Sequence, residues 1–578
     1  KDRRAVAPVQ EALKALDQCK RPYWTYSSCL GLLDMDLRTA EIVLRLAMVK
    51  CIMWDVLDAV SRRRLTQMVV ERVLKPGLEA ERHKTYPWMN SRANWRIILC
   101  GDFAIAAMAF ADDFPEYREL IEYGIEGTMV ALEDGDREGG WDEGPGYWNY
   151  GLGHALYFAF ALNLFTGGAV NLLRHPFLQK TGDFWFYMHV NRRLLWNWSD
   201  CGKLAGYSPT IVSLARACRN PVYQQMAATH EVKSMEHLYR LAWDLPAKAP
   251  TPASYPVRKL FPDLGVLVLR EGFGPKDAYI GFKGGSIPHL NYHSHLDVGN
   301  VVIYSQGREL LAEMDQWPYP YEGDRKADGK KSQAGFYDEE LKRFKRRDFD
   351  DVGAIGHNIV MIEGDYPQPR VKVPARFLRT DFADTHDVAV VDTTPFYRPL
   401  ATRVRRYLVY LRPDICLLVD EVRARRPVQA RVNYHYLPND PALAAQMKRY
   451  GRGIVELGSD RFTICNGPAR LDCRSLHPCR EDHLVIGRDD RRTTYRPPAG
   501  LHERRIEGIY IQNLYRKPRL VFVAALQFGG RKPAPTTFAV EGKPATDDRF
   551  AVTVTRGRKR MRVKFDLAAV QVHVVRPG

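Results

Sequence analysis

The residues best suited to chemistry lie in one short segment, 288–297 (PHLNYHSHLD), which we call the His-rich segment. It holds three histidines, and a single serine separates His293 from His295. If the backbone there is extended, both imidazoles leave it on the same side, because side chains two residues apart along a strand share a face. Two neutral imidazoles that converge on one spot suit a metal ion, a proton-transfer site, or one of each.

A second dense segment, 139–150 (GGWDEGPGYWNY), lies far upstream. It combines two carboxylates with aromatic side chains, among them Tyr147, Trp148 and Tyr150. Taken alone, this run is more typical of a packed aromatic cluster than of a reactive site. The histidine pair, taken alone, is equally compatible with histidines of a surface loop.

The bulk composition is that of a soluble globular protein with more than one domain: 578 residues, 45% hydrophobic and 26% charged. No apolar run approaches the ~20 residues of a membrane-spanning helix, so no membrane span is expected. The formal charge of +17 predicts an anionic partner, which by charge alone could be polysaccharide, nucleic acid or a membrane surface. Because the common zinc-knuckle and RNP signatures are missing from the sequence, nucleic acid is not expected as a partner.

The first residues, KDRR, show no signal peptide. A signal could have been removed before this numbering begins, and we expect a periplasmic or secreted protein. Ten cysteines are too few for a disulfide scaffold. Cys473 and Cys479 are near enough in sequence to pair, whereas most of the others lie in apolar runs typical of a core. Their disulfide state and the oligomeric state stay open.

The first 246 residues have the pattern of helices. From 41 to 60 apolar residues recur at helical spacing, and similar patterns cover 61–83, 94–112, 116–133, 150–166 and 223–243. Short turns rich in glycine, proline and aspartate separate them without a coiled-coil heptad, which favours a bundle, solenoid or toroid. A proline-rich linker at about 247–256 ends this part of the chain.

After the linker, the pattern changes to short runs of β-branched and aromatic residues punctuated by turns. The runs cover 266–269, 301–304, 358–362, 388–391, 407–410, 415–419, 431–436, 520–525 and 570–575. Their length and spacing favour antiparallel sheets packed as a sandwich. The sequence therefore predicts a multidomain α+β protein, with a helical domain over 1–246 and a β-sandwich over 257–578. A cleft between two such domains is a natural ligand site.

Three groups of residues resemble the heparinase II/III type of polysaccharide lyase. The first, 90–95 (NSRANW), is similar to a substrate-contacting asparagine motif, and the second, 142–147 (DEGPGY), to a segment with a catalytic tyrosine. The third begins at 293–297 (HSHLD) and continues through 307–315, 356–358, 405–422 and His435. The resemblance spans about residues 88–440 and implies an (α/α) toroid joined to an antiparallel β-sandwich, in agreement with the elements predicted above.

Lyases of this type break the bond at C4 of a uronic acid by removing the C5 proton and expelling the glycosidic oxygen. The sugar carboxylate must be neutralised as negative charge develops, a role that the resemblance gives to Asn94, helped by Arg92 or Arg96. A base must take the proton and an acid must protonate the leaving oxygen. Tyr147 is the expected acid, or acid and base if it is ionised, and His293 is the expected base for the opposite sugar epimer.

The resemblance also implies a divalent metal, zinc by expectation, bound by His295, Asp315 and His357. Two nitrogens and one carboxylate oxygen, with water as the fourth ligand, form a normal zinc shell. The metal would be structural and pin loops of the sandwich, so that His293 serves the chemistry while His295 binds metal. Glu313 lies two residues before Asp315 and is the alternative oxygen ligand. No organic cofactor is expected.

Further substrate contacts are expected from side chains near these motifs: Arg92, Arg96, Glu143, Trp148, Tyr150, Trp317 and His435. Several have a structural alternative. Glu143 could orient Tyr147 or cap a turn, and the proline-rich loop around Trp317 could pack for its own sake. His435 could be a core residue of its strand. Asn94 taken alone is a favoured helix N-cap residue, a role compatible with catalysis.

The function predicted from these features is a polysaccharide lyase that cleaves a uronic-acid polymer by β-elimination and leaves a 4,5-unsaturated uronate end. A glycosaminoglycan is the expected substrate because the strong positive charge suits a densely sulfated or carboxylated chain. The alternatives are a lyase for alginate or another uronan, a uronate C5-epimerase of the same fold, and a non-catalytic carbohydrate-binding protein.

Overall fold

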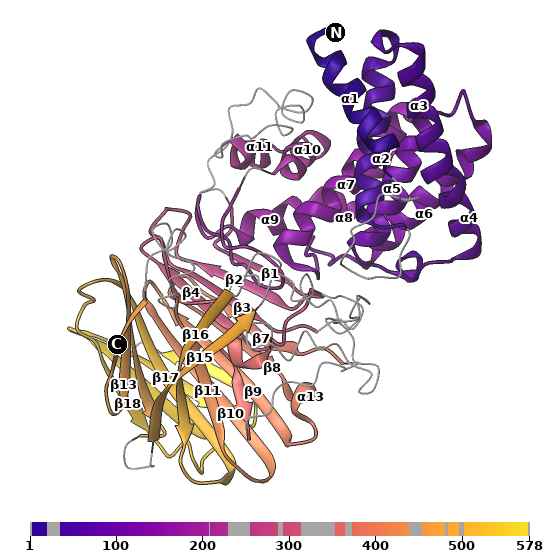
Figure 1. Cartoon of the computed structure of the whole chain (residues 1–578). Coiled ribbons are helices and arrows are strands. Elements are labelled where there is room, and N and C mark those ends of the chain that lie inside the picture. The colour runs from indigo at the N-terminus through magenta and orange to yellow at the C-terminus, as the bar shows by residue number, and fades with distance from the viewer. Residues whose placement is uncertain are drawn as a thin grey trace. The chain divides into compact units, whose positions relative to one another are not determined.

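The chain divides into two compact units (Figure 1). A computed structural model describes residues 3–19, 35–206, 208–228, 255–286, 293–313, 353–363, 373–437, 453–479, 484–495 and 502–575. The described residues of the first unit fall within Lys1–Phe186 and Tyr207–Ala249. Those of the second fall within Tyr187–Gly206, Pro250–Gly323 and Gly335–Gly578. Most of the predicted linker, 247–256, lies outside the described residues, so the boundary drawn there stays a prediction.

The first unit is built from helices, several of which match the predicted ranges. They are α1 (Val6–Asp17), α2 (Leu37–Met53), α3 (Ala59–Val69), α4 (Lys75–His83), α5 (Asn94–Ala109), α6 (Glu119–Asp134), α7 (Gly144–Phe165), α8 (Pro176–Lys180), α9 (Gly182–Met188), α10 (Pro209–Cys218) and α11 (Pro221–Ala228). Side chains of Asp36, Asp58 and Ser208 cap α2, α3 and α10 by accepting backbone N–H groups. The predicted helix over 223–243 is described only as far as 228.

Helix α5 lies at the centre of this unit and packs against α2, α6 and α7. It is buried along most of its length because apolar and small residues occupy nearly every side of it. The approach of α7 is close where Gly151 meets Asn94, since a Cβ at Gly151 would lie 2.8 Å from the Cβ of Asn94. Glycine at this position therefore lets the beginning of α5 rest directly on α7.

The strands of the second unit, in its described residues, form four antiparallel sheets. The first has the order β1 (Arg258–Phe261), β2 (Val266–Arg270), β3 (Tyr279–Lys283), β4 (Val301–Ser305) and β5 (Arg308–Leu311). The largest has the order β12 (Gly453–Leu457), β13 (Arg461–Asn466), β14 (Ala469–His477), β17 (Lys517–Gly530), β10 (Ile415–Val428), β9 (Ala401–Leu411), β8 (His386–Asp392) and β7 (Arg376–Phe382). The third pairs β15 (Leu484–Tyr495), β16 (His502–Asn513), β11 (Ala430–His435) and β6 (Val360–Ile362). The last joins β18 (Thr537–Glu541), β19 (Arg549–Arg556), β20 (Lys559–Asp566) and β21 (Gln571–Val575).

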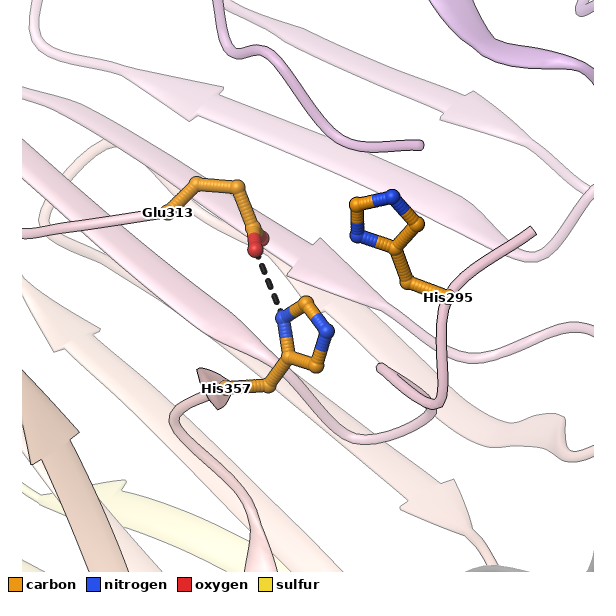
Figure 2. A group of neighbouring side chains, drawn as sticks. All are labelled: His295, Glu313 and His357. Carbon is orange, nitrogen blue, oxygen red and sulfur yellow. Dashed lines mark hydrogen bonds and ion pairs between the residues drawn. The ribbon is translucent and has the colours of Figure 1, made fainter. Parts of the chain in front are cut away.

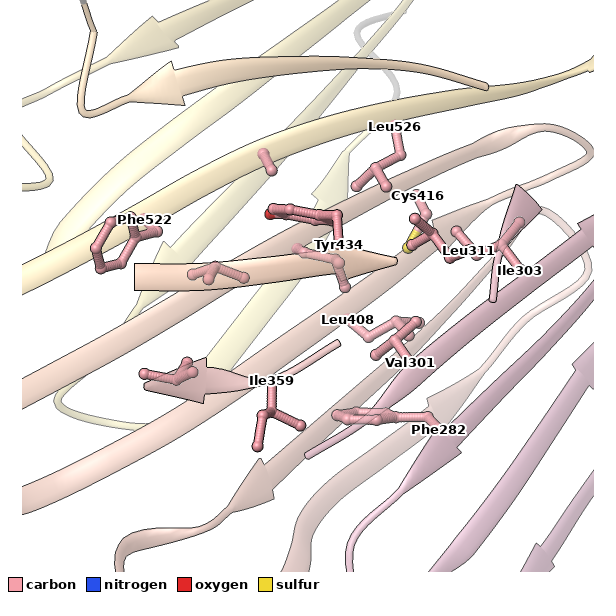
Figure 3. Close-up of a cluster of buried hydrophobic side chains, with 14 of the residues drawn as sticks. Phe282, Val301, Ile303, Leu311, Ile359, Leu408, Cys416, Tyr434, Phe522 and Leu526 are labelled. Carbon is pink, nitrogen blue, oxygen red and sulfur yellow. The ribbon is translucent and has the colours of Figure 1, made fainter. Parts of the chain in front are cut away.

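The central strands of the eight-stranded sheet are buried on both faces, which explains why 407–411 of β9 and 415–419 of β10 are apolar without alternation. Leu408 and Cys416 point into a core shared with the five-stranded sheet and the β15–β16–β11–β6 sheet, and Figure 3 shows part of that core. Their neighbours Val409 and Leu417 point the other way, into a second core against the β18–β21 sheet. Because successive side chains of a strand alternate between faces, one apolar run serves two cores.

The observed architecture confirms the predicted fold class, a helical part followed by an antiparallel β-sandwich. Among the described residues, no helix has the length and apolar character needed to cross a membrane. Cys473 and Cys479 do not form a disulfide with each other, and Cys473 lies in the larger core of the sheets.

One buried ion pair, Arg406 with Asp420, joins neighbouring strands β9 and β10 and is the basis of a stability prediction. Arg406 Nε lies 2.6 Å from Asp420 Oδ1, and the guanidinium also donates to the carbonyls of Gly299 and Asn358. Replacing Arg406 by leucine leaves a buried carboxylate unpaired, so we expect unfolding free energy to fall by about 3–5 kcal/mol. Denaturant unfolding of the intact protein measures this loss.

Two further variants calibrate that loss. The double variant R406L/D420L should recover part of the stability, because neither charge then stays buried alone. Arg549→Leu removes an exposed ion pair with Asp566 and should leave stability essentially unchanged. Strictly additive losses in the double variant would contradict the idea that the unpaired charge is what destabilises the single variant.

Candidate functional site

Three buried side chains of the second unit form a group that could hold a metal ion: His295, Glu313 and His357 (Figure 2). His295 lies in the loop before β4, and Glu313 follows β5 by two residues. His357 follows the 3-10 turn Ala354–Gly356 and precedes β6. The candidate ligand atoms all lie within 4.8 Å of one another. We call these three residues the metal group.

The polar atoms of the metal group are only partly satisfied by protein. Glu313 Oε1 lies 2.6 Å from His357 Nδ1, and the other carboxylate oxygen accepts from Asn300. Figure 2 shows one nitrogen of His295 turned toward Glu313 and His357. His295 Nδ1 and His357 Nε2 are buried and have no hydrogen-bond partner among the described residues. Buried polar atoms without partners are costly, so these nitrogens are suited to an additional ligand.

The chemistry of the donors fits a divalent cation such as zinc. Two imidazoles and one carboxylate, with a further position for water, form a common shell for that ion. Burial by itself lowers the pKa of His357, but the charge and hydrogen bond of Glu313 outweigh burial and raise it. A metal requires the neutral imidazole, so metal uptake would displace a proton from this pair. Asp315 lies outside the described residues, and the carboxylate present in the described metal group is that of Glu313.

His293 lies outside the metal group but is joined to it by one carboxylate, that of Asp200. Asp200 Oδ2 lies 2.9 Å from His293 Nδ1, and Oδ1 lies 3.1 Å from His295 Nε2. The two imidazoles therefore meet at one carboxylate, but the backbone there is a loop, so the extended conformation on which the spacing argument depends is not the one found. With the shared proton on Nδ1, Nε2 is the nitrogen of His293 that can accept a proton.

Lys203 is a second buried side chain from the same part of the chain as Asp200. Its ammonium lies 3.0 Å from both carboxylate oxygens of Glu309 and also donates to the carbonyl of Glu313. Nearby, Lys283 forms a buried ion pair with Asp297 of the His-rich segment. These lysines neutralise carboxylates around the metal group without contributing ligands.

Sequence reasoning missed Asp200 and Lys203. Both lie in Tyr187–Gly206, which falls within the predicted helical domain 1–246 yet belongs to the second unit. The segment carries short β-bridges and has no helical or alternating apolar pattern. The local run Trp196-Asn197-Trp198-Ser199-Asp200 is buried in the structure, but nothing in its sequence indicates a partner 93 residues away.

In the first unit, Tyr147 lies in the first two turns of α7 and is half-buried. Its ring meets that of Tyr150 edge-on, with the ring centres 6.4 Å apart. The hydroxyl of Tyr150 donates to Glu41 Oε1 of α2 at 2.7 Å, which fixes that ring. Tyr147 therefore stands on a rigid helix beside an anchored neighbour, and its position is compatible with the predicted role.

Asn94 and Glu143 form a buried pair that links the beginnings of α5 and α7. The Asn94 amide donates to Glu143 Oε1 at 2.6 Å, and its backbone N–H donates to Oε2 at 2.8 Å. Trp141 also donates to this carboxylate, at 3.3 Å. Asn94 is the first residue of α5 and Ala93 stands at the cap position, so the N-cap alternative does not describe it. Its oxygen Oδ1 is buried without a hydrogen-bond partner among the described residues.

Burial raises the pKa of Glu143 to about 8, and the charge of Asp142 acts in the same direction. The three donors that point at the carboxylate oppose this rise but do not cancel it. Glu143 accepts from both the amide and the backbone N–H of Asn94 and so orients that residue, whereas the alternative that it orients Tyr147 stays a prediction. Asn94 is fully buried in the structure, so its direct contact with a sugar stays a prediction.

The remaining predicted substrate contacts divide by exposure. Arg92 is exposed and pairs with Asp134. Arg96 is buried, and Glu81 accepts two hydrogen bonds from it at 2.8 and 2.9 Å. Arg96 is thus committed to a core ion pair, and a role in substrate binding stays a prediction.

Trp148 is completely buried, so its position does not support the predicted contact with a sugar ring. Its indole N–H donates to Thr181 Oγ1 at 2.8 Å, and its ring stacks on Trp185. His435, at the end of β11, is also buried. Burial, and then the charge of His357, lowers the pKa of His435 to about 4, which keeps it neutral. Trp317 lies outside the described residues.

Comparisons with solved structures bear on the fold. The chain is similar to heparinase III, with a TM-score of 0.66, 12% identity, and coverage of 97% of this chain and 79% of that one. It is similar to the heparan sulfate lyase HepC from Pedobacter heparinus, with a TM-score of 0.62, 13% identity, and coverage of 96% and 78%. The xanthan lyase of Paenibacillus follows with a TM-score of 0.50, 9% identity, and coverage of 98% and 58%.

The chain has a polysaccharide-lyase fold. The resemblance to heparinase-type lyases stated from the sequence is thereby confirmed at the level of the fold, across both units. Neither a protein-family model nor a curated protein matches the sequence. At 9–13% identity, the likeness speaks for the fold alone, and activity has to be argued from the residues of this chain.

The raised pKa of Glu143 generates a prediction for stability against pH. An exposed glutamate titrates near ~4.3, whereas Glu143 titrates at about 8 in the folded protein. The neutral form is therefore favoured by folding, and the stability it gives is complete below pH ~4.3 and lost as pH rises through about 8. Glu143→Gln keeps an uncharged acceptor, so its unfolding free energy should lack this part of the decline between pH 5 and 9.

Denaturant unfolding at a series of pH values measures the decline. Glu138→Gln is the matched control, since Glu138 pairs with Lys180 at the surface and should leave the slope of wild type intact. The assignment to Glu143 is wrong if its glutamine variant loses stability with pH as steeply as wild type does.

Proposed function

We propose that this protein is a polysaccharide lyase that cleaves a uronic-acid-containing polymer by β-elimination. The observation that carries the proposal is the lyase fold over nearly the whole chain, on which this sequence keeps a tyrosine, a carboxylate-bound histidine and a metal group. A binding protein would have no need of a general base or acid, whereas a structural metal is compatible with either class. The fold likeness alone would leave a non-catalytic protein equally possible.

His293 is the proposed base for one uronate epimer. Asp200 accepts from its Nδ1 and thereby fixes both the tautomer and the plane of the ring, as carboxylates do for catalytic imidazoles. Nε2 would then remove the C5 proton of the uronate. Such assistance is typically worth about 10²–10⁴-fold in rate.

Tyr147 is the proposed acid, which returns a proton to the glycosidic oxygen as the bond at C4 breaks. The same hydroxyl, once ionised, can also take the C5 proton of the other epimer. Glu143 lies four residues before Tyr147 and is bonded to Asn94 at the start of α5, and we propose that this pair neutralises the sugar carboxylate or positions the groups that do.

The metal group would hold a structural divalent cation, with zinc proposed on the basis of its donors. His295 Nδ1, a carboxylate oxygen of Glu313 and a nitrogen of His357 are the proposed ligands. A bound cation there supplies positive charge and rigidity. Asn300 donates to Glu313, and Asp200 bonds His295, so hydrogen bonds from residues outside the metal group orient these two ligands.

The proposed substrate class is a glycosaminoglycan. The charge of +17 favours a densely anionic chain over a sparsely charged one, and two of the fold neighbours are named as a heparan sulfate lyase and a heparinase. A xanthan lyase also shares the fold, so other uronans belong in any panel of substrates.

Activity is tested by the absorbance of the unsaturated uronate, read over heparan sulfate, hyaluronan, chondroitin, alginate and xanthan. Tyr147→Phe removes one hydroxyl from a half-buried ring and should preserve the fold. We expect it to reduce the initial rate at least about 10²-fold, in line with the loss of a general acid. Tyr157→Phe, on a half-buried tyrosine of the same helix, is the matched control and should keep wild-type rates.

Two outcomes would overturn parts of this proposal. No absorbance rise with any polymer would remove the lyase, and proton exchange at C5 without cleavage would then identify an epimerase. Full activity of the Tyr147→Phe variant would leave the lyase standing but reject the role of this tyrosine.

Metal content is tested by elemental analysis of protein purified without chelators. We expect about one divalent ion per chain, and its loss in His357→Ala, because a three-ligand site does not survive removal of one buried ligand. His435→Ala removes a neighbouring buried histidine outside the metal group and should retain the ion. Absence of any stoichiometric metal in wild type would refute the site.

A further inference from the structure

We propose that Asp200 is a positioning residue that ties the imidazole of His293 to the metal group through His295. The kinetic part of this inference rests on the proposed lyase function, whereas the metal-binding part does not. Asp200 is buried, and each of its two carboxylate oxygens serves a different histidine. Movement of the carboxylate toward one imidazole therefore changes its hydrogen bond to the other.

The contact with His295 is of the kind that prepares a histidine for metal. A ligating imidazole usually donates its second N–H to a carboxylate, which fixes the ring and strengthens the ligand. His295 uses Nε2 for Asp200, so Nδ1 is the nitrogen directed at Glu313 and His357. Asp200 thus holds His295 in the orientation that the metal group requires.

The backbone around Asp200 is held as firmly as its side chain. Ser199 has a φ of +60°, a left-handed conformation that is uncommon for a residue with a Cβ, and its hydroxyl donates to the carbonyl of His293. Asp200 therefore bonds the side chain of His293 while Ser199 bonds its main chain. Strained residues of this kind persist only where surrounding contacts enforce them.

The segment that delivers Asp200, Tyr187–Gly206, is fastened to the five-stranded sheet at several points. Arg270 of β2 donates to the carbonyls of His189 and Val190. Trp196 lies against Gly281 of β3, where a Cβ would lie 2.6 Å from the indole ring. At its other end Lys203 holds Glu309 and the carbonyl of Glu313.

One segment thus reaches both sides of the metal group: Asp200 holds the His295 side and Lys203 the Glu313 side. Metal binding at His295 would alter the hydrogen bond between Asp200 and His293. By linkage, a change at His293 must then alter the free energy of metal binding by the same amount. The inference therefore predicts that a residue outside the metal shell, His293, affects metal affinity.

The first experiment measures metal affinity by competition with a chromophoric chelator. Asp200→Asn keeps the shape of the side chain but cannot accept from both imidazoles, so we expect zinc affinity to fall about 10–100-fold. In the lyase assay kcat should fall while KM changes little, because the substrate-binding residues are untouched. Asp387→Asn is the matched control: Asp387 is equally buried and is paired with Arg258 and Arg412, and its variant should keep both metal affinity and kcat.

The second experiment is a double-mutant cycle on the same readout, which separates coupling from general destabilisation. His293→Gln should lower zinc affinity in the wild-type background and have no further effect in Asp200→Asn. Unchanged zinc affinity in Asp200→Asn, additive effects in the cycle, or a wild-type protein that binds no zinc would each overturn the inference. If the zinc couplings are found but no lyase activity is, Asp200 remains the residue that couples His293 to the metal group, and only the proposed function is rejected.

Discussion

Burial of ionisable side chains is the constraint on which the second unit depends. A charge taken out of water is tolerated only when another charge or a set of hydrogen bonds replaces the solvent. Around the metal group this requirement is met by partners from distant parts of the chain: Asp200 for two histidines and Lys203 for Glu309. The positions of the site residues therefore follow from charge matching as much as from the strands that carry them.

The matching is incomplete at the metal group itself. Glu313 has both oxygens engaged, and Arg406 and Asp420 satisfy each other between β9 and β10 while Arg406 also holds the carbonyl of Asn358, next to His357. His295 and His357 each keep one buried nitrogen without a partner among the described residues. Two buried imidazole nitrogens without a partner, on side chains that Asp200 and Glu313 hold in place, are the arrangement expected of a structural cation site, because the ligands are positioned before the ion binds.

Much of the fold could be predicted from the sequence because periodicity reports burial directly. The apolar runs at 407–410 and 415–419 predict strands, and their lack of alternation is explained by the two cores on either side of β9 and β10. The helical half was equally readable, since α5 and α6 lie close to the predicted ranges 94–112 and 116–133. Both inferences concern single helices or strands, in which the spacing of apolar residues along a short stretch of chain indicates the local structure.

The site was less predictable, and the residues show why. The spacing of His293 and His295 predicts imidazoles on one side only if the backbone is extended, and the backbone there is a loop. The group that both contact, Asp200, lies in a part of the chain without a pattern of its own. Trp148 and Arg96 carry side chains typical of sugar sites, yet both are buried. The sequence could not show this, because residue type does not reveal which face of a helix is covered. A local sequence pattern indicates the chemistry that a side chain can perform, but it does not indicate which distant residues that side chain contacts.

The segment Tyr187–Gly206 shows that the sequence boundary between a helical and a sheet region need not be the boundary between functional units. Residues after the linker carry the histidines and Glu313, but the carboxylate that orients them comes from within the region predicted to be helical. A sheet unit cut at residue 257 would keep every proposed metal ligand and lose both Asp200 and Lys203. Its histidines would then be buried without an acceptor and Glu309 without a cation, so the metal group is a property of both stretches of chain together.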